Sequence, residues 1–270
     1  MSKLTFLSLL TFVFATVSFA QVSVIGELAR DYDASPGRTI KGEIEVNNSA
    51  DYPQEAKIYQ TDYLFFHDGS NQFPEAGTEA RSNAAWIDFS PERVVVPPGQ
   101  TVTISYEVVV PEDTASFDLE GSFWSMIMVE AIPMQSHESS LGGEEEIKVG
   151  LIQIYRYGVQ IATHFRSEES YEIAFADVAI ADPGTGQSAL KVSVDNTGNI
   201  FMKPNVWVEL FDGNGNKAAR RDAKQARVYP GTSVSYWFDI DDVEPGQYEA
   251  LIVVDAGGEN VFGAQYTVGL

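Results

Sequence analysis

Histidine is a common catalytic and metal-binding side chain near neutral pH, and this chain has only three: His67, His137 and His164. They lie far apart in the sequence, and none has the spacing of a zinc motif. We expect each to be a surface or edge residue rather than a metal ligand. The chain also has no cysteine, which excludes thiol catalysis and cysteine-bound metals. We therefore expect neither a metal nor a cofactor.

Acidic side chains are abundant, with 39 Asp and Glu against 17 Lys and Arg. A glycosidase needs two carboxylates at a fixed separation across a cleft, and no spacing singles out such a pair. The nucleophile-elbow, phosphate-loop and dinucleotide-binding motifs are absent. We therefore expect a protein that is not an enzyme. Its negative charge argues against nucleic acids and anionic membranes as partners, because both bind basic surfaces.

One short segment has the oxygen ligands of a calcium loop at alternate positions, Asp212-Gly213-Asn214-Gly215-Asn216. The closing acidic ligand of such a loop would fall on Ala223, which cannot coordinate a cation. Asp-Gly and Asn-Gly are also strong hairpin signals. The segment is therefore interpreted as a turn between two strands.

The N-terminus has the plan of a secretory signal peptide, which we assign to residues 1–20. Lys3 precedes an apolar run from Leu4 to Val17, and Ser18-Phe19-Ala20 is a small-x-small cleavage site. No later stretch is long and apolar enough for a membrane span. We expect an exported protein, in the periplasm or, as the alternative, on the cell surface.

The rest of the chain alternates with a period of two, as in Val102–Val108, Val206–Leu210 and Val234–Ile240. Runs of this kind, bounded by Gly, Pro and Asn, predict half-buried antiparallel strands. Short strands separated by turn signals favour an all-β fold of two tandem immunoglobulin-like sandwiches.

Three segments recur in the same order, which indicates two copies of one supersecondary plan. Their first occurrences are Ile44–Asn48, Pro98–Thr103 and Gly121–Ala131, and their second are Val192–Asn196, Pro230–Ser235 and Gly246–Ala256. We place the first domain at 22–165 and the second at 170–270, with a short polar hinge at Ser167–Ser170. The first copy is longer, mainly through an insertion between Leu64 and Trp86.

The motifs of the first domain suggest a family. They are Ser90-Pro91, Pro98-Gly99-Gln100, the strand Gly121–Pro133 with Phe123-Trp124, and Tyr155-Arg156. Their order and spacing resemble the N-terminal domain of the periplasmic chaperones of the chaperone–usher pilus pathway. The second domain is similar to generic bacterial immunoglobulin-like modules.

The resemblance implies that the last strand of the first domain ends at Tyr155-Arg156 and adds to a subunit that lacks a strand. It assigns the donated side chains to Ile147, Val149 and Leu151, which alternate. The same side chains could instead pack into the domain's own core, and the alternation does not decide between the two.

The family also holds the client's terminal carboxylate with an Arg near the first strand and a Lys on the last. The resemblance assigns the Arg to Arg30. Counting back from Tyr155-Arg156, the Lys position falls on Ile152, so Lys148 serves only if the strand register shifts.

The leading hypothesis is an exported chaperone-like protein that binds a secreted or pilus-type subunit by strand addition. The alternative is a structural or adhesive surface module without chaperone activity. A third hypothesis, a carbohydrate-binding accessory, requires exposed aromatics such as Trp86 or Trp207. A chaperone should leave the edge of its last strand unpaired, whereas a structural module should cover it. No feature of the sequence indicates an oligomeric state.

Overall fold

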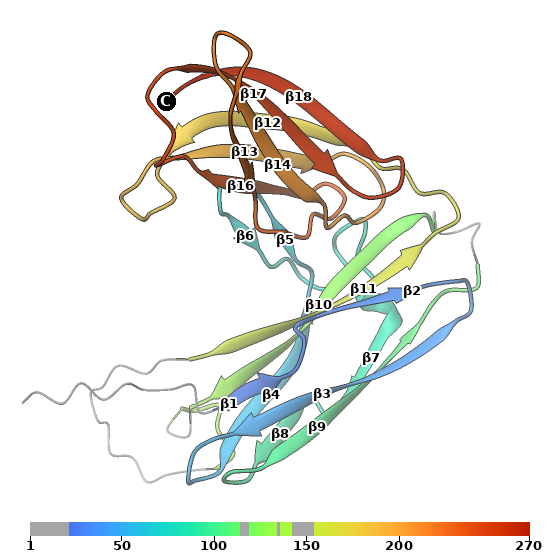
Figure 1. Ribbon diagram of the computed structural model, residues 1–270. Helices are drawn as coiled ribbons and strands as arrows, with labels where there is room; N and C mark the ends of the chain where they lie inside the picture. The colour runs from blue at the N-terminus through green and yellow to red at the C-terminus, as the bar shows by residue number, and fades with distance from the viewer. Residues whose placement is uncertain (1–21, 114–118, 134–135, 142–153) are drawn as a thin grey trace, which may run out of the picture.

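The computed structural model describes residues 22–113, 119–133, 136–141 and 154–270. Its regular structure is β-strand, apart from one short 3-10 turn among these described residues, η1 (Ala84–Trp86). The strands form two sandwiches, which meet where the long strand β10 begins and the long strand β11 ends (Figure 1). The prediction of an all-β fold with two tandem sandwiches is confirmed. The predicted signal peptide, residues 1–20, lies outside the described residues.

The first sandwich pairs a four-stranded sheet with a five-stranded one. The smaller sheet, in spatial order, contains β1 (Val22–Ile25), β3 (Thr39–Asn48), β9 (Thr101–Val109) and β7 (Ile87–Ser90). The larger contains β2 (Ala29–Asp33), β11 (Arg156–Phe165), β10 (Gly121–Ile132), β4 (Gln54–Thr61) and β8 (Arg93–Val96). Alternate residues of both sheets face inward and form one core, which includes the fully buried Ile44, Ile104, Ile127 and Ile161.

The second sandwich has its own core, centred on Leu190, Val208, Phe238 and Ile252. One sheet contains β12 (Ile173–Ala181), β13 (Ala189–Asn196) and β16 (Ser233–Asp239). The other contains β15 (Lys217–Asp222), β14 (Asn205–Phe211), β17 (Gln247–Asp255) and β18 (Val261–Gly269). The proposed domain limits, 22–165 and 170–270, stay a prediction because no measurement tests whether each part folds alone.

The predicted repeat corresponds to matching strands of the two sandwiches: β3 and β13, β9 and β16, and β10 and β17. In each copy a Pro-Gly turn precedes the second strand. Gly99 and Gly231 both have positive φ, at 63° and 74°, a conformation that glycine adopts without strain. The same turn chemistry thus starts the same strand twice.

The first strand of the chain changes sheets. β1 pairs with β3, but β2 pairs in parallel with β11 in the opposite sheet. The change occurs next to Gly26, whose φ of +92° a side chain would oppose. This switch brings β2 alongside only part of β11, and so creates the edge described below.

The insertion in the first sandwich forms a separate arm, which we define as residues 62–82. It contains the two-stranded hairpin of β5 (Leu64–Phe65) and β6 (Asn71–Gln72). The arm reaches out of the first sandwich and lies beneath the second, against β16 (Figure 1).

Candidate functional site

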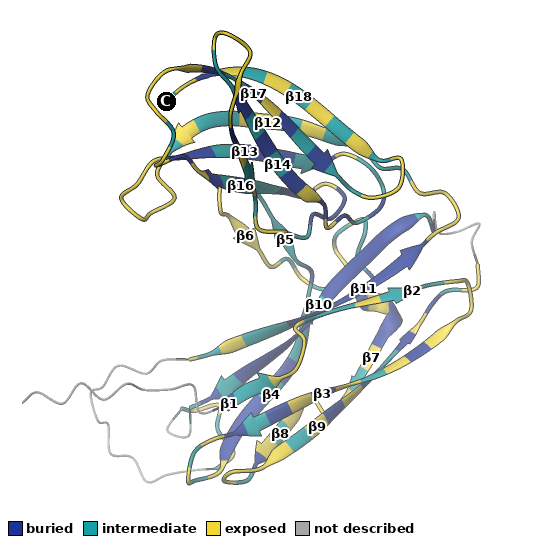
Figure 2. Cartoon of the chain, viewed as in Figure 1, coloured by how far each residue is buried: buried dark blue, intermediate teal, exposed yellow. Residues whose placement is uncertain are grey.

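β11 is the last strand of the first sandwich and leads into the junction with the second. Val159 and Ile161 face the core of the first sandwich, whereas Ala162 packs with Trp124 and Tyr229 of the junction. The strand is consequently buried on both faces from Val159 to Phe165 (Figure 2). The first three residues of β11 are less buried, and Arg156 is exposed.

The start of β11 has an open edge. On one side β10 pairs with Arg156–Phe165, but on the other side β2 pairs only with Gln160–His164. The Gln160 amide donates to the Leu28 carbonyl at 2.8 Å, so its backbone groups point to the β2 side. Because this direction alternates along a strand, the backbone groups of Gly158 and Arg156 point the same way. Among the described residues no strand accepts them.

Exposed apolar side chains occur in the two chain segments that lead to this edge, the one before β2 and the one before β11. Ile25 and Leu28 flank the sheet switch, and each is 44% exposed, while Ile154 directly before β11 is 46% exposed. The Leu28 carbonyl bonds to Gln160, which places that residue where β2 reaches β11. An unpaired edge with apolar neighbours is the surface that an added strand would cover.

The outer face beside the edge is shaped by methionine. Gly158 lies opposite Met128 and next to Met126, and a Cβ at Gly158 would come within 2.6 Å of the Met126 sulfur. The glycine therefore gives the methionine side chains room to cross the strand. Thioether side chains adapt to irregular surfaces more readily than branched ones do.

A buried carboxylate ties the start of β11 to its neighbours. Glu130 on β10 pairs with Arg156 at 2.6 Å and with Lys57 at 3.3 Å, and the Tyr59 hydroxyl donates to it at 2.8 Å. Burial alone would raise the pKa of Glu130, but these donors outweigh it and hold the pKa below its usual range. The open edge is thus supported by a charged anchor.

A second buried carboxylate, Glu55, holds the described part of the loop between β10 and β11. It accepts hydrogen bonds from the Ser140 amide at 2.8 Å and the Ser139 hydroxyl at 3.1 Å, and it pairs with Arg93 at 2.8 Å. Residues 136–141 therefore lie fastened against β4 and β8.

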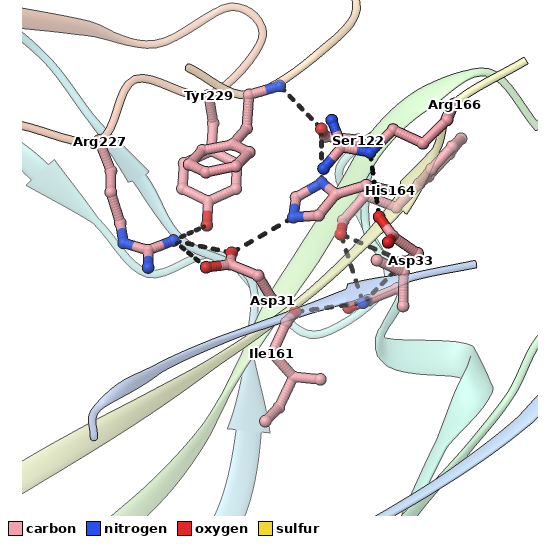
Figure 3. A network of polar contacts seen from close by, with 12 residues as sticks. Asp31, Asp33, Ser122, Ile161, His164, Arg166, Arg227 and Tyr229 are labelled. Atoms are coloured by element: carbon pink, nitrogen blue, oxygen red, sulfur yellow. Dashed lines mark hydrogen bonds and ion pairs between the residues drawn. The ribbon is translucent and has the colours of Figure 1, made fainter. Parts of the chain in front are cut away.

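The other end of β11 reaches a polar network between the two sandwiches (Figure 3). Asp31 on β2 pairs with Arg227 of the second sandwich at 2.6 Å and with His164 at 3.2 Å. His164 also shares a hydrogen bond of 2.8 Å with Ser122 and stacks on Phe201, with ring centroids 4.7 Å apart. Burial would raise the pKa of Asp31, but hydrogen bonds from His164 and Arg227 lower it.

The expectation that all three histidines are surface or edge residues is wrong for His164, which is 1% exposed. Its position at the end of β11, where the second sandwich covers the outer face, explains the burial. His137 is exposed and His67 is half-buried.

The residues that the family resemblance singled out do not come together as a described site. Arg30 on β2 points between the sheets, where it donates to the Glu43 carbonyl and to the Tyr106 hydroxyl, the latter at 3.1 Å. Burial and the Tyr32 hydroxyl raise the pKa of Tyr106 to about 12. The other candidates, Ile147, Lys148, Val149 and Leu151, lie outside the described residues. Their assignment as client-binding residues stays a prediction.

The placement of the last strand was wrong. The resemblance ended it at Tyr155-Arg156, whereas β11 begins at Arg156 and runs to Phe165. A sequence signal for the true strand exists, because Val159, Ile161 and Phe165 alternate with Gln160 and other residues of the junction face. Two adjacent polar residues, Thr163 on the core face and His164 on the junction face, hid the pattern.

Two further predictions can be compared with the structure. Asp212–Asn216 is the hairpin turn between β14 and β15, and the Asp212 carboxylate accepts the amides of Asn214 and Asn216, both at 2.9 Å. Trp86 is buried at 8% exposure, and the Arg220 guanidinium lies 4.7 Å from the centre of the Trp207 ring. Trp86 therefore does not offer the exposed ring that the carbohydrate hypothesis requires, and the Trp207 ring already contacts Arg220.

Within the described ranges, no three His, Asp or Glu side chains converge as metal ligands. In the same residues, no helix has the length and apolar character needed to cross a membrane.

Comparison with known proteins gives structural neighbours only. No protein-family model matches the chain, and neither does any curated protein. A chain in a chaperone–tip adhesin complex of CFA/I fimbriae biogenesis is 12% identical, with a TM-score of 0.48, covering 91% of this chain and 98% of that one. The class 5 fimbriae chaperone CfaA is 13% identical, with a TM-score of 0.46 and coverage of 92% and 100%.

A third neighbour comes from the Salmonella enterica SafA pilin complex with the SafB chaperone. It is 15% identical, with a TM-score of 0.42 and coverage of 94% and 99%. Each of these three alignments covers at least 91% of this chain and so includes both sandwiches.

Proposed function

We propose that this protein is an exported chaperone that holds a secreted or pilus-type subunit by β-strand addition at the open edge of β11. The client strand would lie in line with β2, on the side of Ala29, where β2 begins, and would pair with Arg156–Val159. Backbone hydrogen bonds would supply affinity, and the apolar side chains near the edge would supply register.

The open edge itself carries the proposal. Exposed edges invite aggregation, and proteins usually cover them. In the first sandwich the chain has a strand that could cover the edge, yet β2 covers only the end next to the second sandwich. A purely structural module would have no use for an edge left open beside the exposed Leu28 and Ile154.

The charge of the chain and its N-terminal segment support a protein partner and a periplasmic location. The excess of 39 acidic over 17 basic residues fits a protein partner rather than nucleic acid. The signal peptide assigned to residues 1–20 would direct the chain to the periplasm. Strand addition is a binding activity and requires neither catalysis nor a cofactor.

Photo-crosslinking in cells tests this proposal. A photoreactive amino acid replaces Ile154, which is exposed directly before the edge. Illumination should join the full-length protein to one small exported subunit, which mass spectrometry identifies. In a second strain, Arg156→Pro removes an outward-pointing amide of the edge, so the crosslink should be lost.

Arg156→Ala is the matched control. It removes the ion pair with Glu130, as the proline does, but keeps the backbone amide. The crosslink should therefore persist in this variant. Crosslinks confined to the protein's own chain, or equal loss in both variants, would overturn strand addition at this edge.

A further inference from the structure

The arm, residues 62–82, is rigidly attached to the first sandwich. The Asp62 carboxylate is 1% exposed and accepts the amides of Gly77 at 3.1 Å and Glu79 at 2.8 Å, as well as the Ser82 hydroxyl. The Trp124 indole on β10 donates to the Tyr63 carbonyl at 2.7 Å. Buried carboxylates with several donors hold a loop in one conformation. The base of the arm is therefore part of the first sandwich.

The tip of the same arm is bonded to the second sandwich. The His67 amide donates to the Ser233 hydroxyl at 2.9 Å, and the Ser235 hydroxyl donates to the His67 carbonyl at 2.8 Å. Both serines belong to β16, which lies at the edge of its sheet. Two opposed hydrogen bonds to one residue fix the tip along the direction of that strand.

Between base and tip, the arm completes an apolar joint. Tyr229 of the second sandwich is fully buried, with the Trp124 ring 4.7 Å and the Phe65 ring 6.3 Å from it, centroid to centroid. Leu64 packs against the same cluster. Such edge-to-face and tilted aromatic contacts are directional and resist rotation.

The polar network around Asp31 and Arg227 adjoins this joint, because Phe201 packs on both His164 and Tyr229. There the Ser122 amide donates to the Asn199 carbonyl at 2.8 Å, and the Ser122 hydroxyl accepts from the Phe201 amide at 2.8 Å. One contact region would leave the sandwiches free to rock about it. The bonds of the arm's tip to Ser233 and Ser235 add a further attachment on β16, and this limits the rocking.

We propose that the arm is a brace that sets the angle between the two sandwiches and keeps the space beside β11 preformed. Domains joined by a short linker ordinarily move against one another unless a large interface stops them. The brace enlarges the interface, because it extends the first sandwich beneath β16. This role is independent of whether the edge of β11 binds a client.

Distance measurement between two spin labels tests the brace. The chain contains no cysteine, so Thr103→Cys on β9 and Val261→Cys on β18 accept labels without background. Double electron–electron resonance should give one narrow distance distribution. With Ser233→Ala and Ser235→Ala together, the distribution should become roughly twice as wide. Adding Phe65→Ala should widen it further.

Phe73→Ala is the matched control. Phe73 lies on the same arm and stacks on Tyr63, but it is 53% exposed and has no described contact with the second sandwich. Its removal should leave the distribution unchanged. The double serine variant removes only hydroxyl groups and is expected to fold. An unchanged width in that variant and in the triple variant would overturn the proposal.

Discussion

Asn48 and Asn196 occupy equivalent positions in the two sandwiches and make the same hydrogen bonds. Asn48 ends β3 and Asn196 ends the matching strand β13, and each is at most 1% exposed. Each side-chain amide donates at 2.8 Å to the carbonyl four residues later, and at 3.0 Å to the carbonyl two residues before the Pro-Gly turn. Each side-chain carbonyl accepts the amide two residues later, at 2.9 Å and 3.0 Å. The internal repeat is therefore a repeat of a buried polar clamp.

Replacing either asparagine should destabilise its sandwich. Asn48→Ala and Asn196→Ala each remove three hydrogen bonds made by a buried side chain, at a cost of about 2–4 kcal/mol. Calorimetry should show a lower melting temperature for each variant. Asn47→Ala is the control, since Asn47 is only half-buried and its two side-chain bonds are 3.2 and 3.4 Å long. Equal effects of Asn47→Ala and Asn48→Ala would contradict the clamp.

The elements that the sequence predicts well are those with a local signal. Alternation predicted the strands, and the recurrence of Ile44–Asn48 as Val192–Asn196 predicted two copies of one plan. Asp212-Gly213 predicted a hairpin, because the side chain bonds to the backbone within the same turn.

The parts that failed depend on contacts between distant residues. His164 is buried where Phe201 of the other sandwich stacks on its ring. β11 was misplaced because Thr163 on its core face and His164 on its outer face interrupt the apolar pattern, and both find hydrogen-bond partners only in the folded chain. The arm was visible as an insertion, but its contact with Ser233 spans 166 positions of sequence. No local periodicity reports such a contact.

Acidification should destabilise the first sandwich through Glu55. Burial favours its neutral form, but hydrogen bonds from Ser140, Ser139 and Arg93 prevail and hold the pKa of Glu55 below its ordinary value of 4.5. A carboxyl with a lowered folded-state pKa adds stability above the unfolded-state value, and this is lost as the pH falls through the folded-state value. The melting temperature should therefore drop below about pH 4.5.

Glu55→Gln should make the melting temperature fall less steeply with decreasing pH, while it lowers the stability near neutral pH. Glu45→Gln, at an exposed position on β3, should leave that slope unchanged. Melting curves of the three proteins from pH 3 to pH 7 make the comparison. A fall as steep in Glu55→Gln as in the parent would exclude Glu55 as a source of the acid sensitivity.

The pair of Asp31 and Arg227 should contribute measurably to the junction. Their side chains are 31% and 27% exposed, so solvent screens the pair only partly. A double-mutant cycle with Asp31→Asn and Arg227→Gln should give a coupling energy of roughly 1 kcal/mol that shrinks at high salt. The exposed pair of Lys41 and Glu107, at 79% and 41%, is the reference. Its cycle should give a coupling close to zero, and equal couplings would contradict the prediction.

Gly121 should be the least replaceable glycine at the junction. Its φ is +70°, and a Cβ there would lie 1.8 Å from the Asn199 carbonyl oxygen, so Gly121→Ala must push the sandwiches apart. Gly99→Ala is the matched control, because φ is +63° but the space around it is open. The control should cost about 1–2 kcal/mol from backbone strain alone. Gly121→Ala should cost more than about 3 kcal/mol and shift the spin-label distance between Thr103→Cys and Val261→Cys. If the two alanines lowered the melting temperature equally and left that distance unchanged, the close approach of Gly121 to Asn199 would not be what joins the sandwiches.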